Sequence, residues 1–349
     1  MKRKTTKKIY VGHVPVGGDA PITVQSMTNT KTKDIEGTVS QILRLEDAGC
    51  EIIRFAVNDN DDVAAIAPIK SRIHIPVVVD IQFDYRLAVA SAIAGADCIR
   101  INPGNIGNRD KVYEVVAACK DKNIPIRVGV NSGSLHQDCL DEFGGVNEQS
   151  MVQSGLREIN VLESMGFNNL KISLKASDVG LCIRAYEAFS SVSDYPLHLG
   201  ITEAGPSFQG TIKSAVGMGV LLNEGIGDTI RVSLTADPVE EVRVGLGILK
   251  SLGLRQEGID IVSCPTCART NIDLLGLVDE AQMRLADMDK NLKVALMGCA
   301  VNGPGEAREA DIGIAGGRGE GLIFKKGKIL RKVPESCLLD ALIEEIERM

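Results

Sequence analysis

Three cysteines and one glutamate near the end of the chain have the spacing of a metal centre. Cys264 and Cys267 form a Cys-x-x-Cys pair, which places two thiols on one turn of the backbone. Cys299 can return to the same point if the residues between them fold as a helix followed by a strand, and Glu306 adds a carboxylate soon afterwards. Because thiolates and carboxylates bind metal ions, this spacing indicates a shared metal centre.

Three sulfur atoms leave one coordination position of such a centre unfilled. A structural zinc site takes a fourth Cys or His to complete its tetrahedron, whereas an iron–sulfur cluster can work with an unusual or exchangeable fourth ligand. The motif therefore favours a reactive centre. Cys337, at the start of the last expected helix, is the rival of Glu306 for the fourth position because it would restore four sulfur atoms.

Repeated strand–helix units precede this motif. Short runs rich in Val and Ile predict eight strands, at residues 22–27, 52–57, 76–81, 98–102, 125–130, 170–175, 197–202 and 229–234. Amphipathic segments between them predict helices, among them residues 37–48, 86–94, 111–122, 151–165 and 238–252. Eight such units over about 230 residues match an α/β fold of the TIM-like (β/α)8 barrel type, whose usual size is about 250 residues.

The predicted strands carry polar residues on one alternating face. Barrel strands are buried on both sides, so nearly continuous apolar runs are the rule. Here a period of two places polar side chains on a single side of each strand. If that side is the interior, these residues converge toward the C-terminal mouth, where such barrels place their chemistry. The set comprises Arg54, Asn58, Asp80, Gln82, Arg100, Asn102, Arg127, Asn131, Lys171, Ser173, Lys175, Arg231 and Ser233.

Four arginines and two lysines of this set would form a cationic basin inside an acidic protein. For any one of them, pairing with Asp80 or Glu203 is the simpler interpretation. Six together favour a polyanion site, because buried like charges are costly unless a ligand compensates them. Planar guanidinium groups make bidentate contacts with phosphate, so a diphosphate is a natural occupant.

Composition narrows the function classes. The chain has 349 residues, a net charge of −7 and 3% aromatic residues, which argues against nucleic-acid binding. No apolar run approaches the ~20 residues that cross a membrane, and the basic start leads into no secretion signal. Nine cysteines without an export signal indicate a reducing, cytoplasmic location. Structural roles are expected for the cysteines outside the motif: Cys50, Cys98, Cys119, Cys139, Cys182 and Cys337.

A smaller module is expected after Leu254, where residues 255–258 read as a short linker. The glycine-rich run at 316–321 lies between two expected strands and opens no helix, so it indicates a hairpin turn and not a dinucleotide-binding loop. The domains are therefore expected at 1–254 and 255–349. In the second, strands are expected at 259–262, 292–297, 311–315 and 321–330, and helices at 272–286 and 334–348.

Motifs along nearly the whole chain resemble one known family, 4-hydroxy-3-methylbut-2-enyl diphosphate synthase, the reductive iron–sulfur enzyme of the methylerythritol phosphate route to isoprenoids. Besides the cysteine motif and Val301-Asn302-Gly303-Pro304-Gly305-Glu306, the resemblance rests on these segments: Val24-Gln25-Ser26-Met27-Thr28-Asn29-Thr30, Phe83-Asp84-Tyr85-Arg86, Arg100-Ile101-Asn102-Pro103-Gly104-Asn105-Ile106-Gly107, Arg127-Val128-Gly129-Val130-Asn131, Lys175-Ala176-Ser177-Asp178, His198-Leu199-Gly200-Ile201-Thr202-Glu203-Ala204-Gly205 and Gly225-Ile226-Gly227-Asp228-Thr229-Ile230-Arg231-Val232-Ser233-Leu234.

The resemblance implies a TIM-like barrel joined to a small α+β domain that carries a [4Fe-4S] cluster. It also implies a homodimer in which one subunit's cluster domain caps the partner's barrel mouth. An external electron donor, a flavodoxin or ferredoxin, is implied because flavin and nicotinamide motifs are lacking. Residues 235–263 alone separate the last strand from the cysteine motif, so the chain has the short form of the family. The implied cluster ligands are Cys264, Cys267, Cys299 and Glu306.

The implied reaction is reductive ring opening and dehydroxylation of 2-C-methyl-D-erythritol 2,4-cyclodiphosphate to (E)-4-hydroxy-3-methylbut-2-enyl diphosphate. Glu203, at the end of the seventh strand, is the expected proton-transfer residue. His198 is either a site residue or core filler. The family typically has His where this chain has Gln82, a side chain that cannot titrate near neutral pH. Substrate contacts are expected from Arg54, Asp80, Arg100, Arg127, Asn131, Lys175, His198, Arg231 and Ser233.

Two other function classes remain open from the residues alone. One is a barrel synthase for a pterin or another anionic substrate, with a structural zinc in the C-terminal module. The other is an iron–sulfur electron carrier or scaffold, which would be redox-active without saturable binding of a cyclodiphosphate. Metal content separates the zinc protein from the cluster protein, because the first holds one zinc and the second about four irons and four sulfides. The cationic barrel face counts against the electron carrier.

Overall fold

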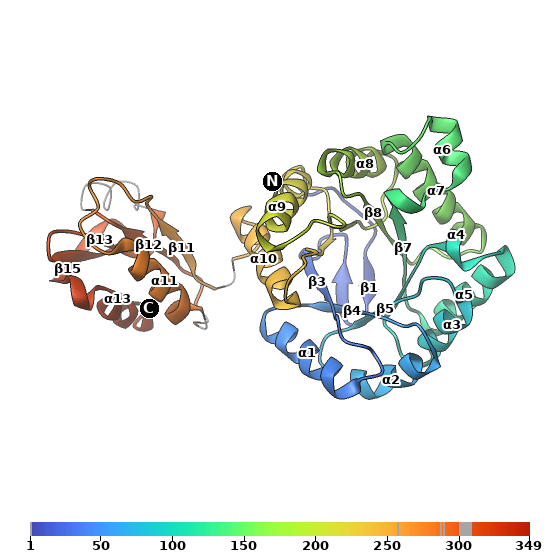
Figure 1. Ribbon diagram of the computed structural model, residues 1–349, viewed down its shortest axis with the longest axis horizontal. Coiled ribbons are helices and arrows are strands. Elements are labelled where there is room, and N and C mark those ends of the chain that lie inside the picture. The colour runs from blue at the N-terminus through green and yellow to red at the C-terminus, as the bar shows by residue number, and fades with distance from the viewer. Residues whose placement is uncertain (1, 257, 287, 289, 300–308) are drawn as a thin grey trace. The chain divides into compact units, whose positions relative to one another are not determined.

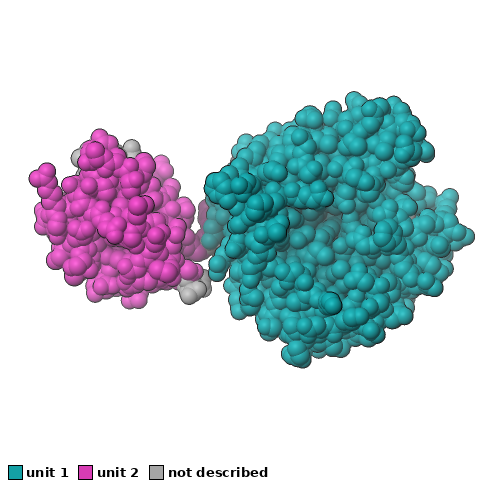
Figure 2. Space-filling model, in the orientation of Figure 1, with its two compact units in different colours: residues 1–254 teal, residues 255–349 magenta. Residues whose placement is uncertain are grey.

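Two compact units make up the chain, residues 1–254 and 255–349 (Figure 2). The computed structural model describes residues 2–256, 258–286, 288, 290–299 and 309–349. Each unit has its own buried apolar cluster, so each is described by itself. Within the described ranges, no helix combines the length and the apolar character needed to span a membrane.

Eight parallel strands form the barrel of the first unit (Figure 1). Their order around the barrel is β8-β7-β6-β5-β4-β3-β10-β9. A bridge between Ile172 and Leu197 joins β8 to the segment just before β9 and completes the ring. The predicted barrel is confirmed. The strands are β3 (Thr23–Met27), β4 (Ile52–Ala56), β5 (Val77–Asp80), β6 (Cys98–Ile101), β7 (Ile126–Asn131), β8 (Leu170–Lys175), β9 (His198–Leu199) and β10 (Thr229–Ile230).

The last two barrel strands are shorter than predicted. Regular pairing covers His198–Leu199 and Thr229–Ile230, where residues 197–202 and 229–234 were expected. Backbone hydrogen bonds continue past β9, from the Arg231 N–H to the Leu199 carbonyl and from the Thr202 N–H to the Ala176 carbonyl, but they do not form a regular ladder.

Helices surround the barrel and cover its outer face (Figure 1). Side-chain caps start several of them; Asp34 and Asp178, for example, accept hydrogen bonds from backbone N–H groups of the first turn. The five predicted helices coincide with α1, α3, α5, α7 and α10. The helices are α1 (Ile35–Asp47), α2 (Asn60–Lys70), α3 (Tyr85–Ile93), α4 (Pro103–Ile106), α5 (Arg109–Lys122), α6 (Gln137–Phe143), α7 (Glu148–Ser164), α8 (Val179–Val192), α9 (Ser207–Asn223) and α10 (Pro238–Ser251).

A hairpin closes the N-terminal end of the barrel. It consists of β1 (Ile9–Val11) and β2 (Val14–Val16), which pair antiparallel. Its side chains form one apolar cluster with residues at the starts of β4, β5 and β6: Ile52, Val78 and Cys98. The sequence did not predict this hairpin, because strands of three residues carry too little pattern. It fills this end with apolar groups, so the polar interior lies toward the C-terminal ends of the strands.

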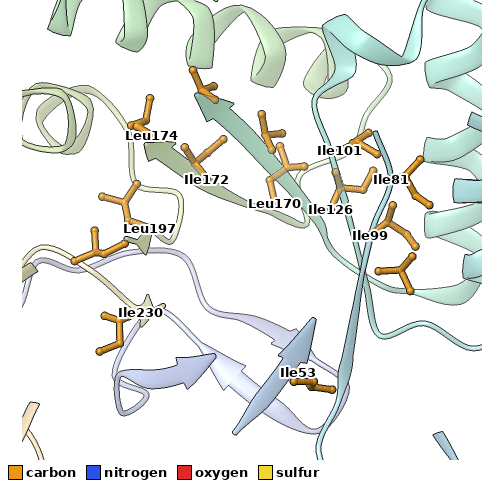
Figure 3. Packing of buried hydrophobic residues seen from close by; sticks show 14 of the residues in the cluster. Ile53, Ile81, Ile99, Ile101, Ile126, Leu170, Ile172, Leu174, Leu197 and Ile230 are labelled. Atoms are coloured by element: carbon orange, nitrogen blue, oxygen red, sulfur yellow. The ribbon is translucent and has the colours of Figure 1, made fainter. Parts of the chain in front are cut away.

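Alternate residues of the barrel strands face the helices and form the main core. Figure 3 shows such side chains on several strands, among them Ile99 and Ile101 on β6 and Leu170, Ile172 and Leu174 on β8. All five are buried. Because successive side chains of a strand point to opposite faces, the polar residues between them point into the interior. The inward face is confirmed for the residues within the strands, whereas the predicted inward residues Asn58 and Gln82 lie beyond the ends of β4 and β5 and are exposed.

A five-stranded sheet organises the second unit, with the order β11-β12-β13-β14-β15. The first three strands run parallel and the last two pair antiparallel. The predicted single strand at 321–330 is wrong: β14 ends at Lys325 and β15 begins at Lys328. Lys326 and Gly327 between them have φ values of 47° and 75°, as a tight hairpin turn requires. The elements are β11 (Asp260–Ser263), α11 (Leu274–Leu285), β12 (Lys293–Met297), β13 (Ile312–Gly316), β14 (Glu320–Lys325), β15 (Lys328–Pro334) and α13 (Leu338–Glu347).

Candidate active site

Six cationic side chains project into the barrel interior, and we call them the barrel cation cluster. Strand register brings them together: Arg100 lies beside Arg127 on the neighbouring strand, and Arg127 lies beside Lys171. Five of the six residues are at most 8% exposed. The cluster comprises Arg54 on β4, Arg100 on β6, Arg127 on β7, Lys171 and Lys175 on β8, and Arg231 just after β10.

Two buried carboxylates contact this cluster. Asp80 Oδ1 accepts a hydrogen bond from Arg100 Nη1 at 3.0 Å, and Asp80 Oδ2 lies 4.0 Å from Arg54 Nε. Glu241 on α10 lies 3.4 Å from Arg231 through its Oε2 atom. In the described part of the chain, Arg127 Nε and Nη1 and Lys171 Nζ have no hydrogen-bond partner. The interior therefore holds more positive charge than its own carboxylates balance.

The pKa values of the cluster reflect this excess of positive charge. Burial, together with repulsion from Arg100, lowers the pKa of Arg127 to about 10. Burial lowers the pKa of Lys171 to about 8, and Arg127 adds to the effect. Lys175 and Arg54 also have pKa values well below their ordinary ones, because each is buried and faces Arg127. An anion bound among these groups would favour their charged forms.

Two glycines leave the space that these cations occupy. A Cβ atom at Gly129 on β7 would lie 2.6 Å from Arg100 Nε, and one at Gly200 would lie 2.7 Å from Lys175 Nζ. No side chain fits at such distances without moving the cation. Gly129 and Gly200 thus allow the two long side chains to cross the interior instead of turning away from it.

Asp80, Asn131 and Ser233 are the other predicted substrate residues. Burial raises the pKa of Asp80, but Arg54, Arg100 and Arg127 outweigh this effect and hold the pKa below its ordinary value, so the carboxylate stays charged. Asn131, the last residue of β7, and Ser233, three residues beyond β10, are half-buried.

His198 is fully buried in this interior. Burial, followed by repulsion from Arg127, lowers its pKa well below the ordinary value, so the imidazole is neutral. Its Nδ1 atom lies 3.4 Å from Thr229 Oγ1. Its Nε2 atom has no hydrogen-bond partner among the described residues. The sequence left open whether His198 is a site residue or fills the core. In the structure it lies in the polar interior and not in the apolar core.

Glu203 lies on an exposed turn four residues beyond β9. Its φ of 51° places it in the left-handed region, which is uncommon for residues other than glycine and costs about 1–3 kcal/mol. Within the described ranges, its carboxylate forms no hydrogen bond or ion pair with the barrel cation cluster. The pairing that the sequence allowed between Glu203 and an inward arginine is therefore absent here, and Glu241 contacts Arg231 instead.

The parallel strands β11 and β12 bring two of the predicted metal ligands to one edge of the second unit's sheet. Cys264 directly follows β11, and Cys299 lies two residues beyond the end of β12. The Gly298 N–H donates a hydrogen bond to Cys264 Sγ at 3.2 Å. Cys264 is half-buried and Cys299 is buried.

Cys267 lies on an exposed turn that leads back toward β12, since the Asn271 N–H donates to the Gly298 carbonyl at 3.0 Å. The backbone N–H of Arg269 hydrogen bonds to the Cys267 thiol and lowers its pKa, and the Arg269 guanidinium adds to this effect. The site thus favours the thiolate, the form that binds metals.

The predicted fourth ligand, Glu306, lies outside the described residues. Its rival Cys337 is exposed next to the start of α13. Among the residues that are described, no group of three or more His, Cys, Asp or Glu side chains is gathered closely enough to hold a metal ion. The thiols of Cys264, Cys267 and Cys299 are ligands that an iron–sulfur cluster takes, so the three residues fit a cluster by their chemistry. Two of them, Cys264 and Cys299, also share one edge of the sheet.

Two family models cover nearly the whole chain. The GcpE TIM-barrel domain matches residues 6–246, and the GcpE protein C-terminal domain matches residues 260–348. The chain belongs to the GcpE family. The first range contains the barrel with its cation cluster, and the second contains the three cysteines of the predicted metal centre.

Full-length relatives of this GcpE chain are enzymes. A protein of Clostridium perfringens (strain 13 / Type A) is 57% identical over 347 residues, which is 99% of each chain. One of Geobacter sulfurreducens is 58% identical over 349 residues, 100% of this chain and 99% of that protein. Both are named 4-hydroxy-3-methylbut-2-en-1-yl diphosphate synthase (flavodoxin). The resemblance inferred from the sequence motifs is confirmed.

Solved structures with a similar fold include two dihydropteroate synthases. The enzyme from Stenotrophomonas maltophilia has a TM-score of 0.54 and 16% identity, covering 71% of this GcpE chain and 98% of that one. The enzyme from Yersinia pestis has a TM-score of 0.53 and 13% identity, covering 71% and 100%. Identities this low show the shared barrel fold alone.

Sequence reasoning missed Glu241 as a residue that contacts the barrel cation cluster. Its Oε1 atom accepts the Leu234 N–H at 2.9 Å, while its Oε2 atom faces Arg231 and Ser26. Although charged, it is 4% exposed and lies on the buried face of α10. A carboxylate at a core position of the predicted amphipathic helix 238–252 was the available signal, since such a group needs a partner.

Proposed function

We propose that the chain catalyses the reductive ring opening and dehydroxylation of 2-C-methyl-D-erythritol 2,4-cyclodiphosphate to (E)-4-hydroxy-3-methylbut-2-enyl diphosphate. The relatives' names support the product. The observation that carries the proposal is the barrel cation cluster, whose Arg127 and Lys171 have buried donor atoms without partners among the described residues. Groups of this kind are stable only if an anion joins them, and a diphosphate supplies the required charge and oxygen atoms.

The barrel residues bind the substrate and stabilise charge that develops on it. As the ring opens, a phosphate oxygen gains negative charge when its C–O bond breaks, and fixed cations stabilise that charge without rearranging. Asp80 orients Arg100 through their hydrogen bond, and the neutral His198 can hydrogen-bond the substrate. The diphosphate is held by Arg54, Arg100, Arg127, Lys175 and Arg231, with hydrogen bonds from Asn131 and Ser233.

Cys264, Cys267 and Cys299 would hold a [4Fe-4S] cluster, with Glu306 as the oxygen ligand of the fourth iron. The lowered pKa of Cys267 supports this assignment, because metals bind the thiolate. When bound, such a cluster supplies electrons one at a time and a Lewis-acidic iron for the tertiary hydroxyl. Residues 1–254 would thus bind the substrate and residues 255–349 the cluster.

The partners follow from the same reaction. Flavodoxin is the supported electron donor because the relatives carry it in their names, and a ferredoxin is the alternative. A second copy of the chain would bring its cluster domain to the barrel mouth, so the active form is a homodimer. The cytoplasm, with its reducing conditions and soluble electron carriers, is the proposed location.

Turnover by the anaerobically reconstituted protein tests the function. We expect reduction of the cyclodiphosphate with a reduced flavodoxin, about four irons and four sulfides per chain, and a brown colour. A second protein, Arg127→Met, tests the barrel cation cluster. It removes a buried cation, so the Kd for inorganic pyrophosphate should rise while the iron content stays unchanged. A colourless protein with one zinc and no turnover would instead favour a synthase with a structural metal.

Mössbauer spectra of the reconstituted protein test the fourth ligand. We expect Glu306→Gln to change the signal of one iron of the four, because an amide oxygen is a weaker ligand than a carboxylate. Cys337→Ser serves as the matched control and should leave the spectrum unchanged. If only the cysteine substitution alters the unique iron, Glu306 is not the ligand.

Glu203→Gln tests the proton-transfer role. Glu203 would move a proton at the hydroxyl oxygen that leaves as water, and general acid–base catalysis contributes about 10²–10⁴-fold. We expect kcat to fall by at least about 100-fold, while pyrophosphate affinity and iron content stay at wild-type values. An equal loss of affinity would assign Glu203 a role in binding instead.

A further inference from the structure

A buried carboxylate on the outer side of the barrel wall connects two loops of the mouth. Glu158 lies in the middle of α7 and is 3% exposed. Its Oε1 atom accepts the backbone N–H of Gly104 at 3.0 Å and lies 2.5 Å from His136 Nε2. We call Glu158, His136 and the Gly104 N–H the loop clip.

The loop clip joins the segments that follow two neighbouring strands of the site. Gly104 comes two residues after Asn102, at the end of β6, and Asn102 Oδ1 also accepts the Gly104 N–H, at 3.2 Å. His136 lies in the segment between β7 and α6. On their inner faces, β6 and β7 carry Arg100 and Arg127, so the clip joins the segments that follow two strands of the barrel cation cluster.

The geometry of the clip is closely defined. A Cβ atom at Gly104 would lie 2.8 Å from Glu158 Oε1 and 2.9 Å from His136 Cε1, so a side chain at this position would have to displace the pair. Burial raises the pKa of Glu158, which shows that this site penalises the carboxylate, although His136 opposes the shift. A carboxylate retained at such a cost is expected to have partners that need it.

The loop has room to move if the clip is cut. An open pocket of about 540 Å³ lies beside it, lined by residues that include Gly104, Gly107, His136 and Glu158. Ile106 anchors the segment in the main core, but Gly104 and Gly107 border this open space, so core packing does not hold their side of the 102–107 segment. The hydrogen bonds of the clip are therefore the restraint on this side of the loop.

We propose that Glu158 is a positioning residue of the active site, which holds the loops after β6 and β7 in the arrangement that binds the diphosphate. The inference rests on the proposed function, because it assumes that these loops border the substrate. Glu158 acts through Gly104 and His136 and does not itself touch the substrate. A misplacement of about 1 Å in such groups can cost about 100-fold in rate.

Two substitutions of Glu158 in the holoenzyme separate positioning from folding. Glu158→Leu retains most of the side-chain volume but removes the acceptor for both partners. Glu158→Gln keeps an oxygen for the Gly104 N–H, so it serves as the conservative rescue. Glu148→Gln, at the start of the same helix, is the matched control. His136→Leu removes the hydrogen bond between His136 and Glu158 from the half-exposed side, so it leaves the buried Glu158 unchanged.

The readouts are kcat and KM for the cyclodiphosphate, pyrophosphate affinity by calorimetry, hydrogen exchange of residues 102–107, and thermal unfolding. For Glu158→Leu and His136→Leu we expect faster exchange in 102–107, a KM at least about 10-fold higher and weaker pyrophosphate binding. Glu158→Gln should restore hydrogen exchange, KM and pyrophosphate affinity most of the way to their wild-type values, and Glu148→Gln should match the wild type in all three.

Unchanged KM and pyrophosphate affinity in Glu158→Leu and His136→Leu would overturn the proposal, even if both proteins melt earlier. If the wild type does not turn over the cyclodiphosphate, the proposed function fails. Pyrophosphate affinity and hydrogen exchange then still decide whether Glu158 positions an anion-binding loop, because neither measurement needs turnover.

Discussion

Lys171 places an ammonium group in the barrel interior with no exposure to solvent. Among the described residues its Nζ atom has no hydrogen-bond partner. The pKa of Lys171 is lowered from 10.5 to about 8, chiefly by burial. A difference of this size corresponds to about 3 kcal/mol of unfavourable interaction in the charged form. Without a bound anion, the side chain therefore destabilises the folded chain at neutral pH.

We predict that Lys171→Met stabilises the ligand-free protein at pH 7. Replacing a buried charge by an apolar side chain of similar length removes the desolvation penalty, so the free energy of unfolding should rise by about 1–3 kcal/mol. Urea unfolding measures the change, and Lys31→Met, at an exposed lysine, is the control. A less stable Lys171→Met protein would mean that another group of the interior compensates the ammonium.

The pH dependence of the stability difference between the wild type and Lys171→Met provides a second check. Between pH 8 and 10.5 the unfolded wild-type chain binds more protons than the folded one, because Lys171 has the lower pKa when folded. Stability contributed by this group therefore rises with pH across that window. The advantage of Lys171→Met should shrink from its full value below pH 8 toward zero near pH 10.5, as urea unfolding at several pH values would show.

At the scale of elements, the weakest part of the barrel wall lies between β8 and β9. Strand pairing there is reduced to the bridge between Ile172 and Leu197. Tyr186 on α8 reinforces this gap: its hydroxyl donates to the His198 carbonyl at 2.6 Å and accepts the Leu174 N–H at 3.0 Å. One buried hydroxyl thus connects two strands that share almost no ladder.

We predict that Tyr186→Phe destabilises the barrel by about 1–3 kcal/mol, because it leaves a buried N–H and a buried carbonyl without partners. Tyr113→Phe, which removes the same atom from an exposed ring, should have no measurable effect. Chemical unfolding of both variants beside the wild type tests the prediction. Equal stability of the two variants would show that the Tyr186 hydroxyl does not hold the gap.

At the scale of the whole molecule, one helix presents an apolar face to solvent. Phe208, Ile212, Val216 and Val220 of α9 recur at every fourth residue and are 73%, 48%, 51% and 38% exposed. Residues spaced in this way lie on the same side of a helix. Lys213 is the single charged residue of the helix. An uncharged apolar face of this kind supports the proposed homodimer, with a second copy of the same helix as its partner.

We predict that the protein is dimeric at micromolar concentration and that Val216→Glu weakens the dimer. A charge buried at the centre of such an interface costs about 2 kcal/mol or more, which raises the dimer Kd by at least about 30-fold. Ile93→Glu, at an exposed aliphatic residue of α3, is the control. Sedimentation velocity over a concentration series measures the Kd. A dimer that survives Val216→Glu uses a different surface.

The sequence predicted the features that depend on local pattern. Apolar alternation and amphipathic spacing located the six longer barrel strands and five of the helices, because these periods follow from backbone geometry alone. The same alternation identified the inward cations. It failed at β9 and β10, where regular pairing ends before the apolar run does, and at the turn formed by Lys326 and Gly327, which divides one apolar run into two strands. Both outcomes depend on neighbours that are distant in sequence or on backbone angles.

By itself the sequence determined the barrel, the cation cluster, the cysteine motif and the family, because residue type and spacing carry that information. Only the tertiary structure decided which charges are balanced. Glu241 contacts Arg231 across the wall and Asp80 binds Arg100, while Arg127 and Lys171 have donor atoms without partners among the described residues. The structure alone also revealed that Glu158 connects two loops of the mouth. Pairing and burial depend on distances between segments far apart in the chain, and a linear pattern does not contain those distances.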